Sequence, residues 1–267
     1  MALRPLLRVL SRVRKDQTWG DLKSLLNDRL FTKQFAAKSQ DPLPPVLFQM
    51  ATGYWLSEVI YVAAKLGIAD LLESGPQSVV ELAATTCSDS RSLFRVLRAL
   101  SNFGVFTQND DGYFALSRVG NALRTNVPGS LRRAVISLGE IHYRACGELL
   151  HAVQTGSPAF NQVYGTSLFE HLQQNPQDSV AFNRGMTDLA YLLAQAVLLA
   201  YDFSDISSIV DVGGGEGKFL RSILELYPAL TGIVFDSSKD LLPRPKEERC
   251  SFIVGNLFDS VPEKAEV

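Results

Sequence analysis

The sequence predicts an α/β fold with a parallel sheet near its C-terminal end, preceded by a larger helical region. Three short apolar runs, at 206–212, 231–235 and 251–254, alternate with a helical stretch and a connection. Glycines cluster directly after the first run, at 213–217, and residues 46–200 show helical periodicity broken by one hairpin pattern. Strands alternating with helices build a parallel sheet with right-handed crossovers.

The glycine cluster stands between the first strand and a predicted helix that begins at Lys218. A dinucleotide fingerprint is excluded, because Lys218 occupies the place of its third glycine, and a P-loop is excluded because Val212 occupies the place of its first. The remaining pattern, D-x-G-G-G-x-G from Asp211, brings backbone N–H groups and a helix N-terminus to the surface, where a ligand can bind. The alternative is a turn that only connects strand and helix.

Composition, net charge and cysteine content argue against several classes of protein. The chain has 267 residues, of which 46% are hydrophobic and 20% charged, as in globular proteins. A net charge of −2 gives no reason to expect binding to nucleic acid. Cys87, Cys146 and Cys250 are odd in number and far apart, which predicts no disulfide framework, no metal site and a reducing, cytoplasmic location. No apolar run is long enough to span a bilayer.

The chain is expected to contain four segments. Residues 1–15 carry five basic and no acidic residues, which is typical of a surface-seeking helix, a transit peptide or a helix that packs on the protein or on a partner. Prolines within 41–45 indicate a boundary. The predicted segments are an N-terminal helical extension (1–45), a winged-helix domain (46–120), a helical linker region (121–202) and the sheet domain (203–267).

The winged-helix prediction rests on helix and turn signals in order. Ser78 and Glu81 form a capping box, Ser90 starts a further helix, and Asn109 to Gly112 have the composition of a hairpin turn. Three helices followed by a hairpin indicate a winged helix. Arg91, Arg95 and Arg98 would suit contacts with DNA phosphates.

The predicted wing tip favours dimerisation over DNA binding. Asp110 and Asp111 stand where a DNA-binding wing needs Lys or Arg, and they would repel phosphates. We therefore expect this domain to mediate dimerisation.

Two further features concern ligands. Asp236 lies 25 residues after Asp211, at the end of the second strand, where a carboxylate accepts hydrogen bonds from a ribose diol; the alternative is an Asx turn. Phe182 and Met186 are four residues apart on a helix predicted from Ala181 to about Ala200. Taken alone, the two side chains are most simply interpreted as residues of the hydrophobic core.

Together these motifs resemble the S-adenosylmethionine (SAM)-dependent O-methyltransferases of the caffeate/acetylserotonin type. The resemblance covers about residue 50 to the end and rests on the winged helix, Phe-Asn-Arg-Gly-Met at 182–186, the glycine motif, Phe-Asp at 235–236 and Gly-Asn-Leu-Phe at 255–258. It implies a Rossmann-like SAM-binding domain, a homodimer formed through the winged-helix domain, and a small hydroxyl-bearing, aromatic acceptor held between the two domains.

The resemblance also implies roles for individual residues. The cofactor-binding set would be Asp211, Gly213, Gly215, Asp236, Asn256 and Leu257, with Gly213 beside the methionine part of SAM, Asp236 on the ribose, and Asn256 and Leu257 flanking the adenine. Phe182 and Met186 would line the acceptor pocket, which reverses the core interpretation.

The sequence departs from the family pattern in three places. Asn256 replaces the usual Asp, and Ala190 stands where the family has a hydroxyl residue. The family's catalytic histidine lies downstream of Gly-Asn-Leu-Phe, beyond the next strand, whereas the histidines here are His142, His151 and His171, which we interpret as pocket or surface residues.

The resemblance places the family's catalytic histidine beyond Val267, the last residue of this sequence. We therefore assign no catalytic residue and expect an O-methyltransferase-type chain that lacks the C-terminal catalytic part and, as given, does not methylate at a useful rate. The alternative is a non-catalytic dimerising or regulatory protein that keeps the fold, with a transcription factor as a third interpretation. The acceptor is not identified by the sequence.

Overall fold

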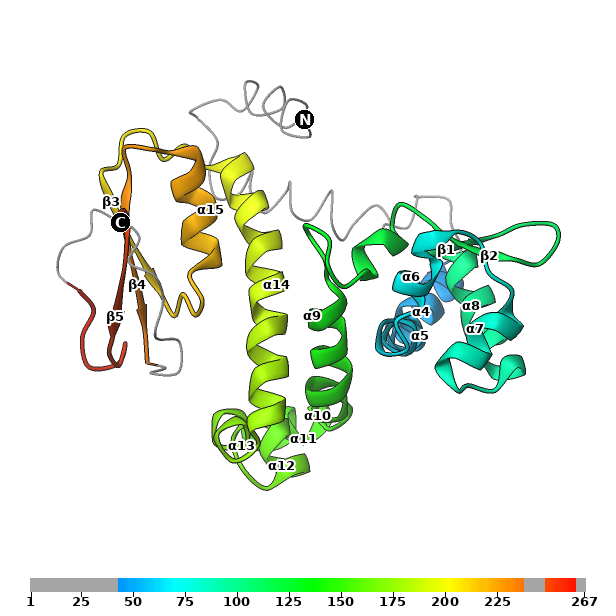
Figure 1. Cartoon of the computed structure of the whole chain (residues 1–267). Helices are drawn as coiled ribbons and strands as arrows, with labels where there is room; N and C mark the ends of the chain where they lie inside the picture. Colours follow the sequence, from blue (N-terminus) through cyan, green and yellow to red (C-terminus); the bar gives the residue numbers. More distant parts are fainter. Residues whose placement is uncertain (1–42, 238–247, 263–267) are drawn as a thin grey trace. The chain divides into compact units, whose positions relative to one another are not determined.

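The computed structural model describes residues 43–237 and 248–262 (Figure 1). The chain divides into two compact units, one formed by residues 47–189 and the other containing residues 190–267. The predicted basic segment 1–15 lies outside the described residues, and the four-segment division stays a prediction. The expectation of a missing catalytic part also stays a prediction.

The first unit begins with a winged-helix domain, as predicted. Its elements are α4 (Leu43–Ala51), α5 (Gly53–Lys65), α6 (Ile68–Leu71), η2 (Leu72–Ser74), α7 (Val79–Thr86), α8 (Ser90–Asn102), β1 (Phe106–Gln108), β2 (Phe114–Leu116) and η3 (Gly120–Leu123). β1 and β2 pair antiparallel, with Thr107 opposite Ala115. Leu82, Leu97 and Phe114 are completely buried where α7, α8 and the hairpin meet.

Local capping explains the ends of these helices. The N–H of Glu81 donates to Ser78 Oγ at 3.3 Å and the N–H of Ser78 donates to Glu81 Oε2 at 2.7 Å, which is the predicted capping box. The hydrogen bonds that the N–H and the hydroxyl of Ser78 donate to the Glu81 carboxylate lower the pKa of Glu81. α8 begins at Ser90, and Asp89, one residue earlier, caps it by accepting from the N–H of Ser92 at 2.8 Å.

The proline-rich segment differs from expectation. Pro44 and Pro45 were expected to stop a helix, but they lie in the first turn of α4. The first turn tolerates proline because its N–H groups have no partner within the helix.

The rest of the first unit is helical. Its elements are α9 (Arg132–Ser137), the π-helical turn η4 (Leu138–His142), α10 (Tyr143–Gly147), α11 (Leu149–Thr155), α12 (Ala159–Tyr164), α13 (Leu168–Gln174) and α14 (Pro176–Ala200). α14 continues into the second unit. The prediction that this helix begins at Ala181 is wrong by about one and a half turns, because Pro176 serves as its first residue rather than as part of a turn.

The second unit contains the predicted parallel sheet. β3 (Ser208–Val212), β4 (Thr231–Asp236) and β5 (Cys250–Val254) pair in the order β3-β4-β5, and α15 (Lys218–Leu226) connects the first two. A Cβ at Gly232 would lie 2.7 Å from the side chain of Leu220, so α15 packs closely on β4. Leu220, Ile223 and Leu230 form the core with Leu198 of α14.

Candidate cofactor-binding site

The predicted cofactor residues gather at one edge of the sheet. Val212 is in register with Phe235, and Asp236 with Val254, so the carboxyl ends of all three strands meet there. The glycine loop 213–217, Asp236 and the segment after Val254 follow these ends directly. This edge is where open α/β sheets bind ligands.

The glycine loop has two kinds of glycine. Gly217 is the N-cap residue of α15 and lies in the left-handed region at φ 71°. A Cβ there would lie 2.8 Å from Val234 Cγ2. Gly213 and Gly215 also have positive φ, at 74° and 52°, but a Cβ at either would meet nothing within 4 Å. Gly217 is therefore required for packing, whereas Gly213 and Gly215 leave open space in front of the backbone.

Asp236 is tied to this loop. The backbone N–H of Gly215 donates to Asp236 Oδ2 at 2.9 Å, and the N–H of Gly213 donates to the carbonyl of Phe235 at 2.7 Å. The end of β4 thus holds the loop at two points. The half-buried carboxylate of Asp236 lies beside the open side of the loop.

Asp211 lies beneath the loop. A Cβ at Gly214 would come within 2.6 Å of the Asp211 carboxyl carbon. Burial raises the pKa of Asp211, the backbone N–H of Leu220 lowers it, and the charge of Asp236 raises it further. The Oδ2 atom of Asp211 is buried and has no hydrogen-bond partner among the described residues. The two carboxylates are therefore close enough to repel each other.

The segment after β5 forms a turn around Asn256. Asn256 Oδ1 accepts from the N–H of Phe258 at 3.1 Å, and Nδ2 donates to Asp259 Oδ2 at 3.1 Å. Leu257 follows as an exposed apolar side chain. Asn256 keeps a second lone pair on Oδ1, which can accept another hydrogen bond.

Phe182 and Met186 belong to the first unit. The ring of Phe182 stacks on His142 with centroids 5.8 Å apart and packs against the cluster of Ile141, Phe160 and Leu172. Met186 is half-buried one turn further along α14. His171 Nε2 lies 2.8 Å from Asp178 Oδ2, and the three histidines, His151 included, all lie in this unit.

No residue is assigned as a catalytic base, and this part of the interpretation stays a prediction. Residues 190–262, which include the glycine loop, contain no histidine in the sequence. The position of the family's catalytic histidine remains an implication of the resemblance.

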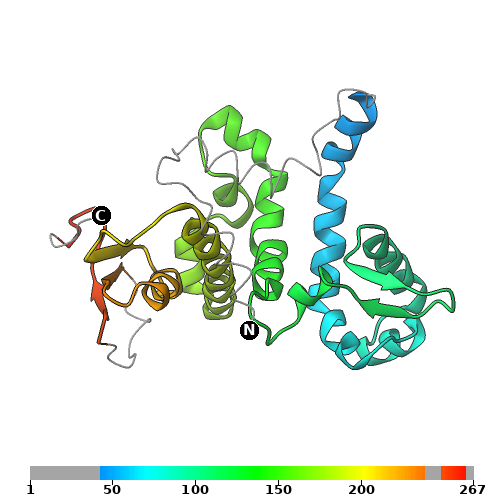
Figure 2. The same ribbon diagram turned by 90° about the horizontal axis from the view of Figure 1, so that it is seen from above.

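α9 and η4 lie beside the first half of α14 (Figures 1 and 2). Sequence patterns did not reveal this packing. A Cβ at Gly185 would lie 3.1 Å from Ser137 Cβ and 3.2 Å from Ala134 Cα, so the two helices approach closely there. Arg133 binds the buried carboxylate of Asp188. The signal was present in the sequence, since an acid such as Asp188 within an apolar helix needs a partner.

Other kinds of site are not seen in the described ranges. No cluster of three potential metal ligands occurs there. Within those ranges, no helix is long and apolar enough to cross a membrane. No disulfide joins any of Cys87, Cys146 and Cys250, all of which the structure describes.

Comparison with known proteins defines the class. Residues 146–267 match the family model of the O-methyltransferase domain, and residues 48–126 match that of the O-methyltransferase dimerisation domain. The chain therefore belongs to the SAM-dependent O-methyltransferase family, with a dimerisation domain and a Rossmann-like methyltransferase domain.

Individual relatives agree with this family. Phenazine O-methyltransferase PhzM of Lysobacter antibioticus is 40% identical over 233 residues, which are 85% of this chain and 68% of that protein. Phenazine-1-carboxylate N-methyltransferase of Pseudomonas aeruginosa is 32% identical over 83% of this chain and 67% of its own length. This chain thus spans about two thirds of the length of these relatives.

Solved structures show the same fold. Human N-acetylserotonin methyltransferase in complex with SAM superposes with a TM-score of 0.74 at 25% identity, covering 85% of this chain and 70% of that one. The family uses SAM as its cofactor.

Proposed function

We propose that this protein transfers a methyl group from SAM to a hydroxyl group of a small aromatic molecule. The observation that carries this proposal is the hydrogen bond from Gly215 to Asp236, which holds a carboxylate beside a glycine loop with open space in front of it. Ribose hydroxyls donate well to such a carboxylate.

The charges of the site fit SAM. Asp211 and Asp236 repel each other, and this repulsion contributes to the raised pKa of Asp211. A cofactor that carries a sulfonium and an ammonium group would relieve the repulsion. Asp211 adds its charge from beneath Gly214, and Gly213 is proposed to lie along the methionine part of SAM.

The adenine would lie against the segment after β5. Leu257 provides an exposed apolar side chain, and Asn256 Oδ1 can accept a second hydrogen bond. Because Asn256 is neutral, it brings no charge to this contact. Ala190 offers no hydroxyl for a further one.

The acceptor is proposed to contact Phe182 and Met186. The named relatives act on a phenazine and on N-acetylserotonin, both aromatic compounds. An aromatic ring and a thioether suit a planar acceptor of this kind. The acceptor must carry a hydroxyl to be methylated on oxygen.

SAM, when bound, would supply an electrophilic methyl carbon, whose bond to the sulfonium sulfur would break to give a neutral thioether. The acceptor oxygen forms the new bond to this carbon, and its hydroxyl proton must pass to a base. No residue is assigned as this base, because the resemblance places the family's catalytic histidine after Gly-Asn-Leu-Phe at 255–258, and His142, His151 and His171 all precede that motif. We therefore expect residues 1–267 to bind SAM more effectively than they turn it over.

Calorimetric titration of residues 1–267 with SAM tests the proposal. Saturable binding with one site per chain is expected. Absence of binding by a folded chain would contradict the cofactor assignment and favour a regulatory protein that keeps the fold.

The proposed partner of the winged-helix domain is a second copy of the chain. Leu47, Phe48, Met50, Tyr54 and Trp55 expose large apolar side chains on α4 and the start of α5, which we call the α4–α5 face. Exposed apolar patches of this kind mark interaction sites. The match of residues 48–126 to a dimerisation domain indicates which partner covers it.

A further inference from the structure

Two consecutive arginines at the start of α9 bind different parts of the first unit. Arg132 contacts the winged-helix domain, and Arg133 contacts α14. The start of α9 is thus bound at two points, to the winged-helix domain through Arg132 and to α14 through Arg133.

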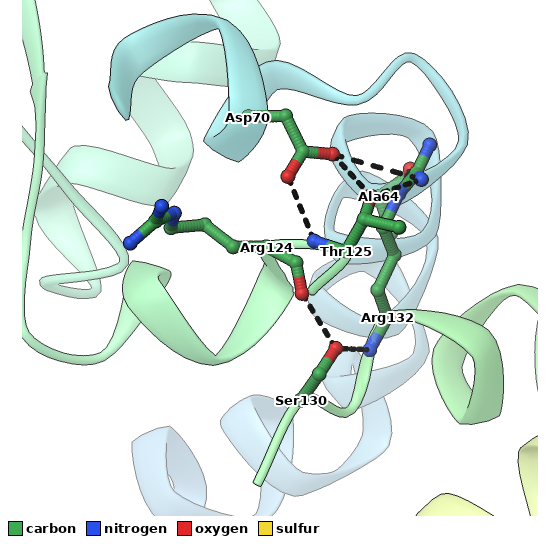
Figure 3. Close-up of polar contacts among 6 residues, drawn as sticks. All are labelled: Ala64, Asp70, Arg124, Thr125, Ser130 and Arg132. Carbon is green, nitrogen blue, oxygen red and sulfur yellow. Dashed lines mark hydrogen bonds and ion pairs between the residues drawn. The ribbon is translucent and has the colours of Figure 1, made fainter. Parts of the chain in front are cut away.

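Arg132 closes the end of α5 (Figure 3). Its Nε donates to the carbonyl of Ala64 at 2.8 Å, and its Nη1 donates to Thr125 Oγ1 at 2.7 Å. Asp70 Oδ2 lies 3.6 Å from the same Nη1. A cation at this position also interacts favourably with the negative, C-terminal end of the α5 dipole.

The connection before α9 is fixed by the same cluster. The N–H of Thr125 donates to Asp70 Oδ1 at 2.7 Å. Ser130 Oγ donates to the carbonyl of Arg124 at 2.6 Å and accepts from the N–H of Arg132 at 3.3 Å (Figure 3). The Arg132 side chain therefore binds the first turn of α9 to α5 and α6, and its backbone N–H binds that turn to Ser130 of the preceding connection.

Arg133 makes the second of these contacts. Its Nε lies 3.2 and 3.1 Å from the two carboxylate oxygens of Asp188, and its Nη2 also bonds Oδ1. The Asp188 side chain is 5% exposed, whereas that of Arg133 is 48% exposed. Removing the arginine would leave a buried carboxylate without this ion pair, which is strongly unfavourable.

These contacts set the register of α14. Arg133 meets Asp188, Ser137 meets Gly185, and His142 meets Phe182. Residue numbers rise along α9 and η4 as they fall along α14, so the two segments run antiparallel. A one-turn slip would separate the ion pair and place a side chain where Gly185 now fits.

We propose that Arg132 and Arg133 are positioning residues, which together hold the Phe182–Met186 segment of α14 in fixed register on the winged-helix domain. This inference rests on the proposed role of Phe182 and Met186 in binding the acceptor. The side chain of Arg132 bonds Ala64, Asp70 and Thr125, all before α9, so its effect on Met186 passes through α9.

Methionine methyl NMR provides a direct test, because the chain contains three methionines, Met1, Met50 and Met186. The full chain is labelled on its methionine methyl groups, and the signals are assigned with Met50→Leu and Met186→Leu. Met186 reports on α14, and Met50 on α4. The measurement needs neither SAM nor acceptor, so its failure is distinct from failure of the proposed function, which SAM titration detects.

The variants are Arg132→Gln and Arg133→Ala, with Arg98→Ala as the matched control. Arg98 lies on α8 and stacks over Phe94, 5.8 Å from its ring. Asp188→Asn replaces Arg133→Ala if that variant does not fold, since it removes the buried charge but keeps the shape. Arg133→Lys is the conservative variant, which keeps the cation without the two-point contact.

The expected result is a shift of the Met186 signal beyond its linewidth in both Arg132→Gln and Arg133→Ala, with Met50 unmoved. Arg98→Ala should leave both signals in place, and Arg133→Lys should give a smaller shift than Arg133→Ala. An unmoved Met186 signal in Arg132→Gln overturns the proposal, because α14 would then be positioned independently of the winged-helix domain. An unmoved signal in Arg133→Ala or Asp188→Asn overturns it equally.

Discussion

The backbone N–H of Gly215 donates to Asp236 Oδ2 at 2.9 Å, joining the glycine loop to the end of the neighbouring strand across 21 residues of sequence. This bond orders the loop before any ligand arrives. It also fixes the carboxylate beside the backbone that the cofactor is proposed to approach. A preorganised site loses less entropy on binding.

Asp236→Ala should weaken SAM binding by about 1.5–3 kcal/mol, the range for hydrogen bonds to a charged group. The substitution removes both the proposed ribose contact and the bond to Gly215. Calorimetric titration measures the loss. Asp205→Ala, an exposed acid in the same unit, is the control and should bind as the wild type does. Equal affinity in Asp236→Ala would exclude the ribose assignment.

Two glycine substitutions separate packing from binding. Gly217→Ala and Gly215→Ala both place a side chain at positive φ, which costs about 1–2 kcal/mol. At Gly217 the new Cβ also collides with Val234, which adds about 1–3 kcal/mol.

Urea unfolding should therefore show Gly217→Ala as the less stable variant of the two. Gly215→Ala should instead lose SAM affinity, because its Cβ enters the space in front of the loop. Equal destabilisation by both substitutions would contradict this division between a packing glycine and a ligand-facing one.

The sheet was predictable because its signals are local. The prediction that α15 spans 218–226 is confirmed, and the first strand begins two residues later than expected, at Ser208. The capping box of Ser78 and the hairpin are confirmed for the same reason, since each depends on a few neighbouring residues.

Contacts between distant residues were not predictable. The ion pair of Arg133 and Asp188 joins positions 55 apart, and nothing near either residue indicates its partner. The hydrogen bond of Gly215 to Asp236 was likewise not foreseen, although both residues were predicted to bind the cofactor. Those binding roles stay predictions.

Asp211 should make stability depend on pH. Because burial raises its pKa above the usual 3.8, the folded state binds a proton more readily than the unfolded state. Protonation of Asp211 therefore stabilises the folded state. Its contribution to the free energy of unfolding is fully present below the pKa of the unfolded state and is lost as the pH rises through the pKa of the folded state.

Asp211→Asn should thus melt at a higher temperature than the wild type near neutral pH, where the buried charge is unfavourable. The difference should shrink as the pH falls to about 4. Thermal melts at both pH values measure it. A variant less stable than the wild type at neutral pH would mean that the ionised carboxylate stabilises the fold.

The α4–α5 face should form the dimer interface. Phe48→Ser combined with Trp55→Ser should convert the dimer to monomer without unfolding it, because both side chains are exposed, at 65% and 56%. Light scattering measures the mass. Val80→Ser, an equally exposed residue on α7, is the control and should remain dimeric. A wild-type monomer that retards duplex DNA, with affinity falling steeply as salt rises, would favour DNA binding instead.

The final prediction concerns turnover by residues 1–267. Deprotonating an acceptor hydroxyl by a positioned base is worth about 10²–10⁴ in rate, and the chain's three histidines all lie in the unit of residues 47–189, away from the glycine loop in sequence. Phenols that are already ionised at the assay pH need no base. They should therefore be methylated measurably, whereas phenols that remain protonated should react slowly at the same SAM occupancy. The assay follows formation of the demethylated cofactor across a series of phenols of graded acidity. Rates independent of phenol acidity would show that these residues do contain a base, and substitution of His142, His151 and His171 in turn would then identify whether it is an imidazole.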